Sequence, residues 1–74
     1  MYFYRSKKQK LYDPELGQHV SFGIGVWKPF AAAPVLFIPD VSLDGKAVRR
    51  LALRCTLCQL DPLHLWDVVE DFIG

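Results

Sequence analysis

The first half of the chain alternates apolar and polar residues with the period of two that is typical of β-strands. The pattern predicts strands at residues 2–12, 19–27 and 35–38, with turn residues at 13–17. Residues 19–27 carry the clearest signal, because four large apolar side chains share one face: Val20, Phe22, Ile24 and Val26.

Two glycines lie on the opposite face of this second predicted strand. Gly23 and Gly25 weaken a strand and commonly mark a place where another group comes close. We therefore expect either a bulge or a close approach of backbone or side chain at these positions.

The second half of the chain changes to the apolar spacing of helices. One helix, with Ser42 or Asp44 as its N-cap, is predicted from five positions on one side: Val48, Leu51, Ala52, Cys55 and Cys58. A second helix starts at Asp61-Pro62 and has an apolar arc of Leu65, Trp66, Val68, Val69, Phe72 and Ile73. The sequence therefore predicts an α+β fold: a small antiparallel β-meander of about three strands, followed by two α-helices packed on one face (βββαα).

The length of 74 residues favours a single domain, with residues 1–39 as the sheet half and 40–74 as the helical half. Hydrophobic residues make up 51% of the chain and charged residues 23%, which excludes a disordered protein. A core this small gains little stability on its own, so self-association as a homodimer is a natural supplement.

Charge is unevenly distributed although the formal net charge is only +1. Residues 1–12 hold four cations and residues 61–74 hold four anions. Unless the two ends neutralise each other in the fold, this dipole favours an oriented partner or a head-to-tail contact between copies.

The chain contains no apolar run of membrane-spanning length, because the longest, at residues 30–38, is broken by Pro34. Aromatic and basic residues occupy the segment where a secretory signal needs an apolar run. We therefore expect a cytoplasmic protein without a membrane partner, whose two cysteines are reduced thiols.

The helical half resembles a family of small bacterial proteins known only as a domain of unknown function. The resemblance is carried by residues 40–44, the spacing of Val48, Leu51 and Cys55, and the blocks at 60–65 and 67–72. Upstream, residues 22–24 match the short aromatic-Gly-Ile element of such proteins. The resemblance implies their fold and a bacterial origin, and no activity.

Cys55 and Cys58 have the spacing of a metal-binding or redox pair. Redox chemistry is disfavoured because the pair lies near the end of the predicted helix rather than at its N-terminus. Together with His64 and His19 the two thiols make a Cys2His2 set, so a small metal-binding module is one alternative. Packing in the core is the favoured interpretation, and no cofactor is expected.

His64 and Asp67 stand three residues apart and could act as an acid-base pair. No convincing nucleophile accompanies them, and the acidic group of Asp67, Glu70 and Asp71 has no phosphate-binding loop beside it to suggest magnesium chemistry. We therefore expect a binding or regulatory protein rather than an enzyme.

The favoured function is protein-protein interaction. The expected partner surface is an apolar patch with flanking cations: Leu53, Leu57, Trp66, Ile73, Arg50 and Arg54. Burial of Leu53 and Leu57 between the two helices is an equally weighted alternative.

A nucleic-acid-binding regulator is the other alternative. Its contacts would come from the basic first strand and first helix: Arg5, Lys7, Lys8, Lys10, Lys46 and Arg49. The near-zero net charge and the acidic second helix argue against it.

Overall fold

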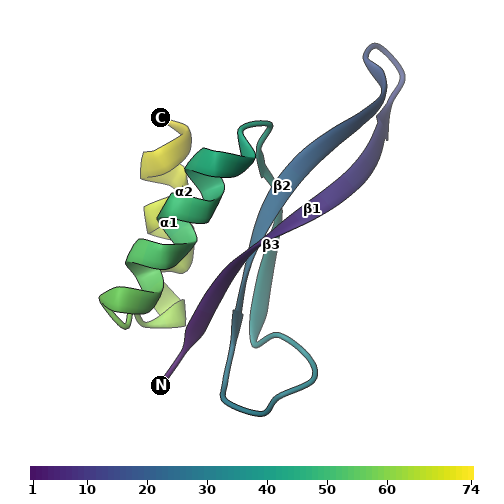
Figure 1. The fold of residues 1–74 in the computed structure, drawn as a ribbon. Coiled ribbons are helices and arrows are strands. Elements are labelled where there is room, and N and C mark those ends of the chain that lie inside the picture. Colours follow the sequence, from purple (N-terminus) through teal and green to yellow (C-terminus); the bar gives the residue numbers. More distant parts are fainter.

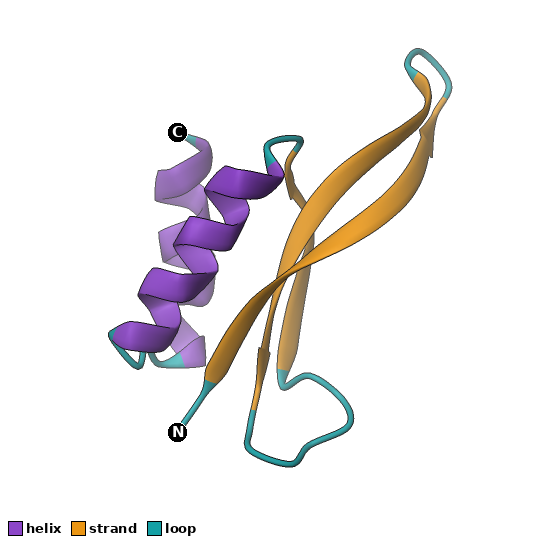
Figure 2. Cartoon of the chain, viewed as in Figure 1, coloured by secondary structure: helices purple, strands orange, loops and turns teal.

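A computed structural model describes all residues, 1–74, and has three strands followed by two helices. The elements are β1 (Phe3–Asp13), β2 (Gly17–Trp27), β3 (Leu36–Ser42), α1 (Gly45–Leu57), a 3-10 turn η1 (Pro62–His64) and α2 (Leu65–Ile73). The strands form one antiparallel sheet in the order β1-β2-β3, and both helices lie on the same side of it (Figures 1 and 2). The predicted βββαα fold is confirmed.

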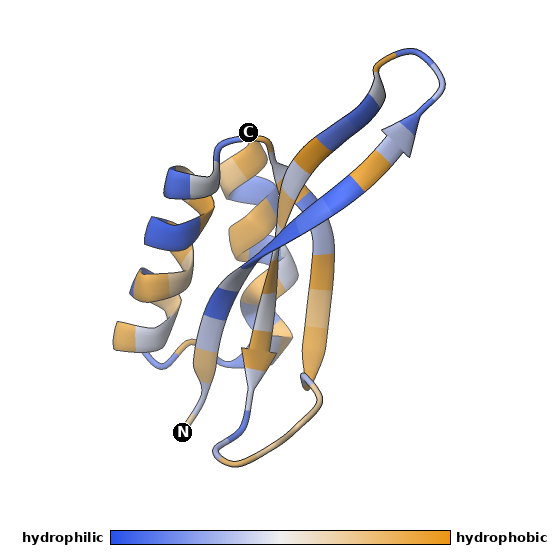
Figure 3. Ribbon diagram, turned by 45° about the vertical axis from the view of Figure 1, so that its right-hand side comes forward, coloured by the Kyte–Doolittle hydropathy of each residue, from blue (hydrophilic) through white to orange (hydrophobic).

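The hairpin of β1 and β2 is much longer than the rest of the sheet. The two strands pair from Phe3↔Trp27 to Asp13↔Gly17, whereas β3 pairs only with the part of β2 between Phe22 and Val26. The distal half of the hairpin therefore extends beyond β3 and the helices (Figure 1). It is mostly hydrophilic, with isolated apolar positions (Figure 3).

The core lies between the sheet and the two helices. Alternation turns Ile24 and Val26 of β2 toward the helices, where they meet Val48 of α1 and Leu65 and Val69 of α2, all fully or almost fully buried. Val20 points to the same side, but it remains 39% exposed because it lies on the distal hairpin, beyond the cover of the helices.

Side-chain caps explain where α1 and η1 begin. Asp44, rather than Ser42, is the N-cap of α1, and its carboxylate accepts hydrogen bonds from the backbone N–H groups of Lys46 and Ala47. Asp61 caps η1 in the same way by accepting from the N–H of Leu63 at 3.0 Å.

Three details differ from the sequence prediction. The second helix was predicted to start at Asp61-Pro62, but this point forms the 3-10 turn η1, and α2 begins at Leu65. The third strand continues past Pro39 to Ser42, because an edge strand tolerates a residue without an N–H group. Cys58 is the C-cap of α1 and is exposed, so only Cys55 of the two thiols belongs to the core.

Residues at and just after the C-terminal end of α1 form hydrogen bonds with the start of β1. The side-chain amide of Gln59 accepts from the backbone N–H of Tyr2 at 2.8 Å and donates to its carbonyl at 3.0 Å. The N–H of Tyr4 donates to Oγ1 of Thr56 at 2.9 Å. These contacts satisfy backbone groups on the free edge of the sheet, which would otherwise be available for pairing with another chain.

Candidate functional site

The outer face of α1 carries two exposed leucines among cations. Val48, Leu51 and Cys55 face the core, so helical geometry turns Leu53 and Leu57 to the opposite side, where they are 57% and 74% exposed. The alternative in which these leucines are buried between the helices is therefore wrong. They lie on the same side as three exposed basic residues, and we call this group the α1 outer face: Lys46, Arg49, Arg50, Leu53 and Leu57.

Neither exposed leucine of α1 lies between the two helices. A groove of about 230 Å³ between the two helices is lined by Ala47, Arg50, Leu51 and Arg54 of α1 and by Phe72 of α2. Phe72 thus marks the side of α2 that is turned toward α1.

Trp66 and Ile73 lie on the other side of α2. They are 52% and 63% exposed, and helical geometry separates them from Phe72 by the buried Leu65 and Val69. The structure therefore does not join them to Leu53 and Leu57 in one patch, as the sequence prediction supposed. They form a second surface with three exposed carboxylates, the α2 outer face: Trp66, Asp67, Glu70, Asp71 and Ile73.

The four candidate metal ligands are dispersed. Cys55 is 4% exposed, and burial together with the neighbouring Cys58 raises the pKa of its thiol. His64 is exposed at the start of α2, and His19 lies on the distal hairpin. No group of three or more His, Cys, Asp or Glu side chains is placed to hold a metal ion. The structure thus offers no support for the metal-binding module.

The candidate acid-base pair is open to solvent. His64 and Asp67 are both exposed, and the His64 side chain makes no capping hydrogen bond to the backbone of α2. General acid-base catalysis needs a group held within hydrogen-bond reach of a substrate, and no capping hydrogen bond orients the His64 ring at this helix end.

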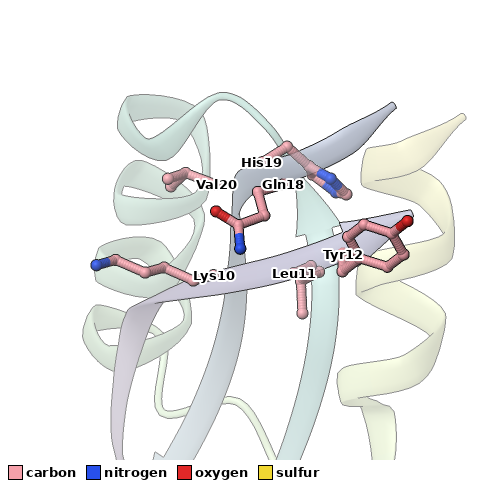
Figure 4. A pocket seen from close by; sticks show the side chains of 6 residues that line it. All are labelled: Lys10, Leu11, Tyr12, Gln18, His19 and Val20. Atoms are coloured by element: carbon pink, nitrogen blue, oxygen red, sulfur yellow. The ribbon is translucent and has the colours of Figure 1, made fainter. Parts of the chain in front are cut away.

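A hollow of about 400 Å³ lies on the distal hairpin (Figure 4). Its lining includes His19, whose Nδ1 is 3.3 Å from the carbonyl oxygen of Gly17, together with Lys10 and Tyr12. Figure 4 shows these side chains spread along the two strands rather than directed at a common centre. The hollow thus has the shape of an open surface.

The six candidate nucleic-acid contacts fall on both sides of the sheet. In β1, Arg5 and Lys7 point away from the helices, whereas Lys8 and Lys10 share the face of the buried Tyr4. Lys46 and Arg49 belong to α1, on the helix side.

Sequence reasoning missed Trp27 and Phe37, two of the aromatic residues that accompany Arg5 and Lys7 on the open face of the sheet. Strand alternation and register place Phe3, Trp27 and Phe37 there. The signal was present in the two glycines of β2, which lie on this same face and leave room for large rings.

Fold and surfaces together define a small two-layer α+β domain with exposed apolar and charged faces. No helix has the length and apolarity needed to cross a bilayer. A model of a family of unknown function, DUF6514, matches residues 1–74, so the chain belongs to that family. No curated protein and no solved structure matches the chain.

Proposed function

We propose that this protein is a non-catalytic binding protein whose partner is another protein, docked on the α1 outer face. The observation that carries the proposal is the exposure of Leu53 and Leu57 on a helix whose buried side already fills the core. Exposed apolar side chains with a polar rim are typical of partner surfaces. The cations beside them select a partner with acidic and apolar side chains on one surface.

A second copy of the chain supplies such a surface. The α2 outer face places Trp66 and Ile73 beside Glu70 and two further carboxylates. Docking α2 of one copy against α1 of the next pairs apolar with apolar and negative with positive side chains. Because the two surfaces differ, a single contact of this kind is head-to-tail and leads to rings or open chains, whereas a two-fold dimer needs both reciprocal contacts at once.

The non-catalytic part of the proposal is supported by the dispersal of reactive groups. Cys55 is buried in the core, His64 is exposed at a helix end, and the hollow beside His19 lies far out on the hairpin. A catalytic site needs several such groups at one point. We further propose a bacterial cytoplasmic origin, which agrees with two free thiols.

Sedimentation velocity over a wide range of protein concentration tests the proposal. We expect the weight-average sedimentation coefficient to rise with concentration and to fall when salt is added. Leu57→Gln should abolish this rise, whereas Leu16→Gln should not, since Leu16 has a similar exposure of 70% but lies at the hairpin tip. A protein that stays monomeric at all concentrations would contradict the proposal.

A further inference from the structure

Neither helix covers the open face of the sheet, and the β2–β3 loop borders it through Ala32 and Pro34. Both helices pack on the other side, so the residues of β1, β2 and β3 that point away from them are left without a partner layer (Figures 1 and 3). Five of these residues form what we call the open-face patch: Phe3, Arg5, Lys7, Trp27 and Phe37.

Two aromatic rings of this patch lie against the two glycines of β2, which have no side chains. A Cβ atom at Gly25 would come within 2.7 Å of the Trp27 ring, and one at Gly23 within 2.7 Å of the Phe37 ring. The rings thus occupy the space that side chains at these two positions would fill. Both rings remain partly exposed, so the sheet presents them as a shallow platform.

Two adjoining hollows surround Trp27, with volumes of about 280 and 430 Å³. Lys7 and Trp27 line both, Phe37 lines the first, and Arg5 and Lys28 line the second. Neither hollow has a carboxylate in its lining. The surface around the exposed rings is therefore positively charged.

Three of the eight acidic residues lie on the opposite side of the sheet from this patch. Asp67, Glu70 and Asp71 belong to α2, on the far side of the sheet, so the near-zero net charge does not describe the open-face patch. Asp40 of β3 is on the open face but lines neither hollow, and its carboxylate accepts a hydrogen bond from the hydroxyl of the buried Ser21.

We propose that the open-face patch binds single-stranded nucleic acid. Unpaired bases stack on exposed aromatic rings, and this stacking depends little on base identity. The ring of Trp27, and beside it that of Phe37, provides the stacking surface, while Arg5 and Lys7 bind the phosphates. A duplex keeps its bases stacked on one another and thus has no free ring face for the platform.

A second copy of the chain fits this face poorly. A two-fold contact brings the same patch of each copy together and would place Arg5 and Lys7 against their own equivalents. No carboxylate in the two hollows would compensate these charges. An acidic protein segment could neutralise them without using the exposed rings, so it serves as the competing occupant in the test.

Fluorescence anisotropy with labelled oligo(U) and oligo(dT) at low salt tests the proposal. Removing both cations with Arg5→Gln/Lys7→Gln should weaken binding at least about tenfold and lower the salt slope by about 1.4, because each phosphate contact on a single strand contributes about 0.7. The matched control is Lys10→Gln/Lys46→Gln, which removes the same charge at positions outside both hollows and should change affinity less than about twofold. Equal loss in both variants, or no binding by the parent protein, overturns the proposal.

Quenching of tryptophan fluorescence detects the stacking of bases on Trp27 directly. In a Trp66→Phe background Trp27 is the one remaining tryptophan, and its fluorescence should be quenched as oligo(U) binds. Trp27→Leu should lose affinity while circular dichroism shows an intact fold. Unchanged Trp27 fluorescence on binding, equal affinity for a duplex of the same length, or tight binding to polyglutamate with none to oligonucleotides would each contradict the proposal.

Discussion

The phenolic hydroxyl of Tyr4, in β1, donates a hydrogen bond to the backbone carbonyl of Leu60, which lies 56 positions further along the chain. Tyr4 is 5% exposed, and its ring belongs to the core. This bond ties the first strand to the segment that connects α1 with η1. It thereby joins the two halves of the chain at the end where β1 begins.

Replacing Tyr4 with Phe should lower the free energy of unfolding by about 1–2 kcal/mol, because the Leu60 carbonyl loses its donor. Urea denaturation measures the change. Tyr12→Phe is the control, since Tyr12 is 73% exposed and its replacement should have little effect. Equal stabilities of the Tyr4 and Tyr12 variants would show that the bond does not stabilise the fold.

The same tyrosine should make stability depend on alkaline pH. Burial, followed by the charges of Cys55 and Asp61, raises the pKa of Tyr4 from 10.0 to about 12. Since the folded-state pKa lies above the unfolded one, the neutral phenol stabilises the fold fully below pH 10.0, and this stabilisation is lost as the pH rises toward about 12. The parent protein should therefore lose more stability across this interval than Tyr4→Phe.

The two strand glycines should respond differently to alanine. A methyl group at Gly23 would meet the backbone carbonyl oxygen of Ile38 at 2.7 Å, so Gly23→Ala should cost about 2 kcal/mol or more through overpacking. At Gly25 the obstacle is the end of the Trp27 ring, which can rotate at a cost of about 0.5–1.5 kcal/mol. Urea denaturation of the two variants checks this order.

Trp27 fluorescence also distinguishes Gly23→Ala from Gly25→Ala. In the Trp66→Phe background, Gly25→Ala should shift the Trp27 emission because the ring must move. Gly23→Ala should leave the emission of the folded protein closer to that of the parent. A larger stability loss for Gly25→Ala than for Gly23→Ala would contradict the assignment of the close contacts.

The two thiols should react at very different rates. Cys58 is exposed, whereas Cys55 is buried and its thiol has a raised pKa, so less of it is the reactive thiolate. A thiol reagent such as DTNB should modify one cysteine rapidly in the native protein and both in denaturant. Cys58→Ser should remove the fast phase, and rapid reaction of both native thiols would refute the burial of Cys55.

Charge reversal on either helix should abolish the head-to-tail contact proposed for the helices, and mixing the two reversed variants should restore it. Arg49→Glu/Arg50→Glu makes the α1 outer face acidic, and Glu70→Lys/Asp71→Lys makes the α2 outer face basic. Each variant alone should stay monomeric in sedimentation, because α1 and α2 of its own copies then carry like charges. An equimolar mixture should associate, since each face finds its opposite on the other variant.

Failure of the mixture to associate would indicate that the α1 and α2 outer faces do not meet. Circular dichroism of both variants is the control for folding. All four substituted residues are exposed, so the reversed charges should leave the core intact.

The order of elements could be predicted from the sequence, because strand and helix periodicity are local properties of the chain. Alternation around Ile24 and Val26 predicted β2, and the spacing of Val48 and Leu51 predicted α1. Cap chemistry, which also involves only neighbouring residues, predicted a helical start at Asp61-Pro62, and the structure has the 3-10 turn η1 there, with α2 following from Leu65.

The surfaces were decided by the tertiary structure. Leu53 and Trp66 both belong to amphipathic helices, but only the packing of α1 and α2 against the sheet determined that they face different sides. The position of Trp27 beside Phe37 depends on the register between β2 and β3, which no local pattern contains. Periodicity reports which side of an element is apolar, whereas the neighbours of that side are set by contacts between residues distant in the chain.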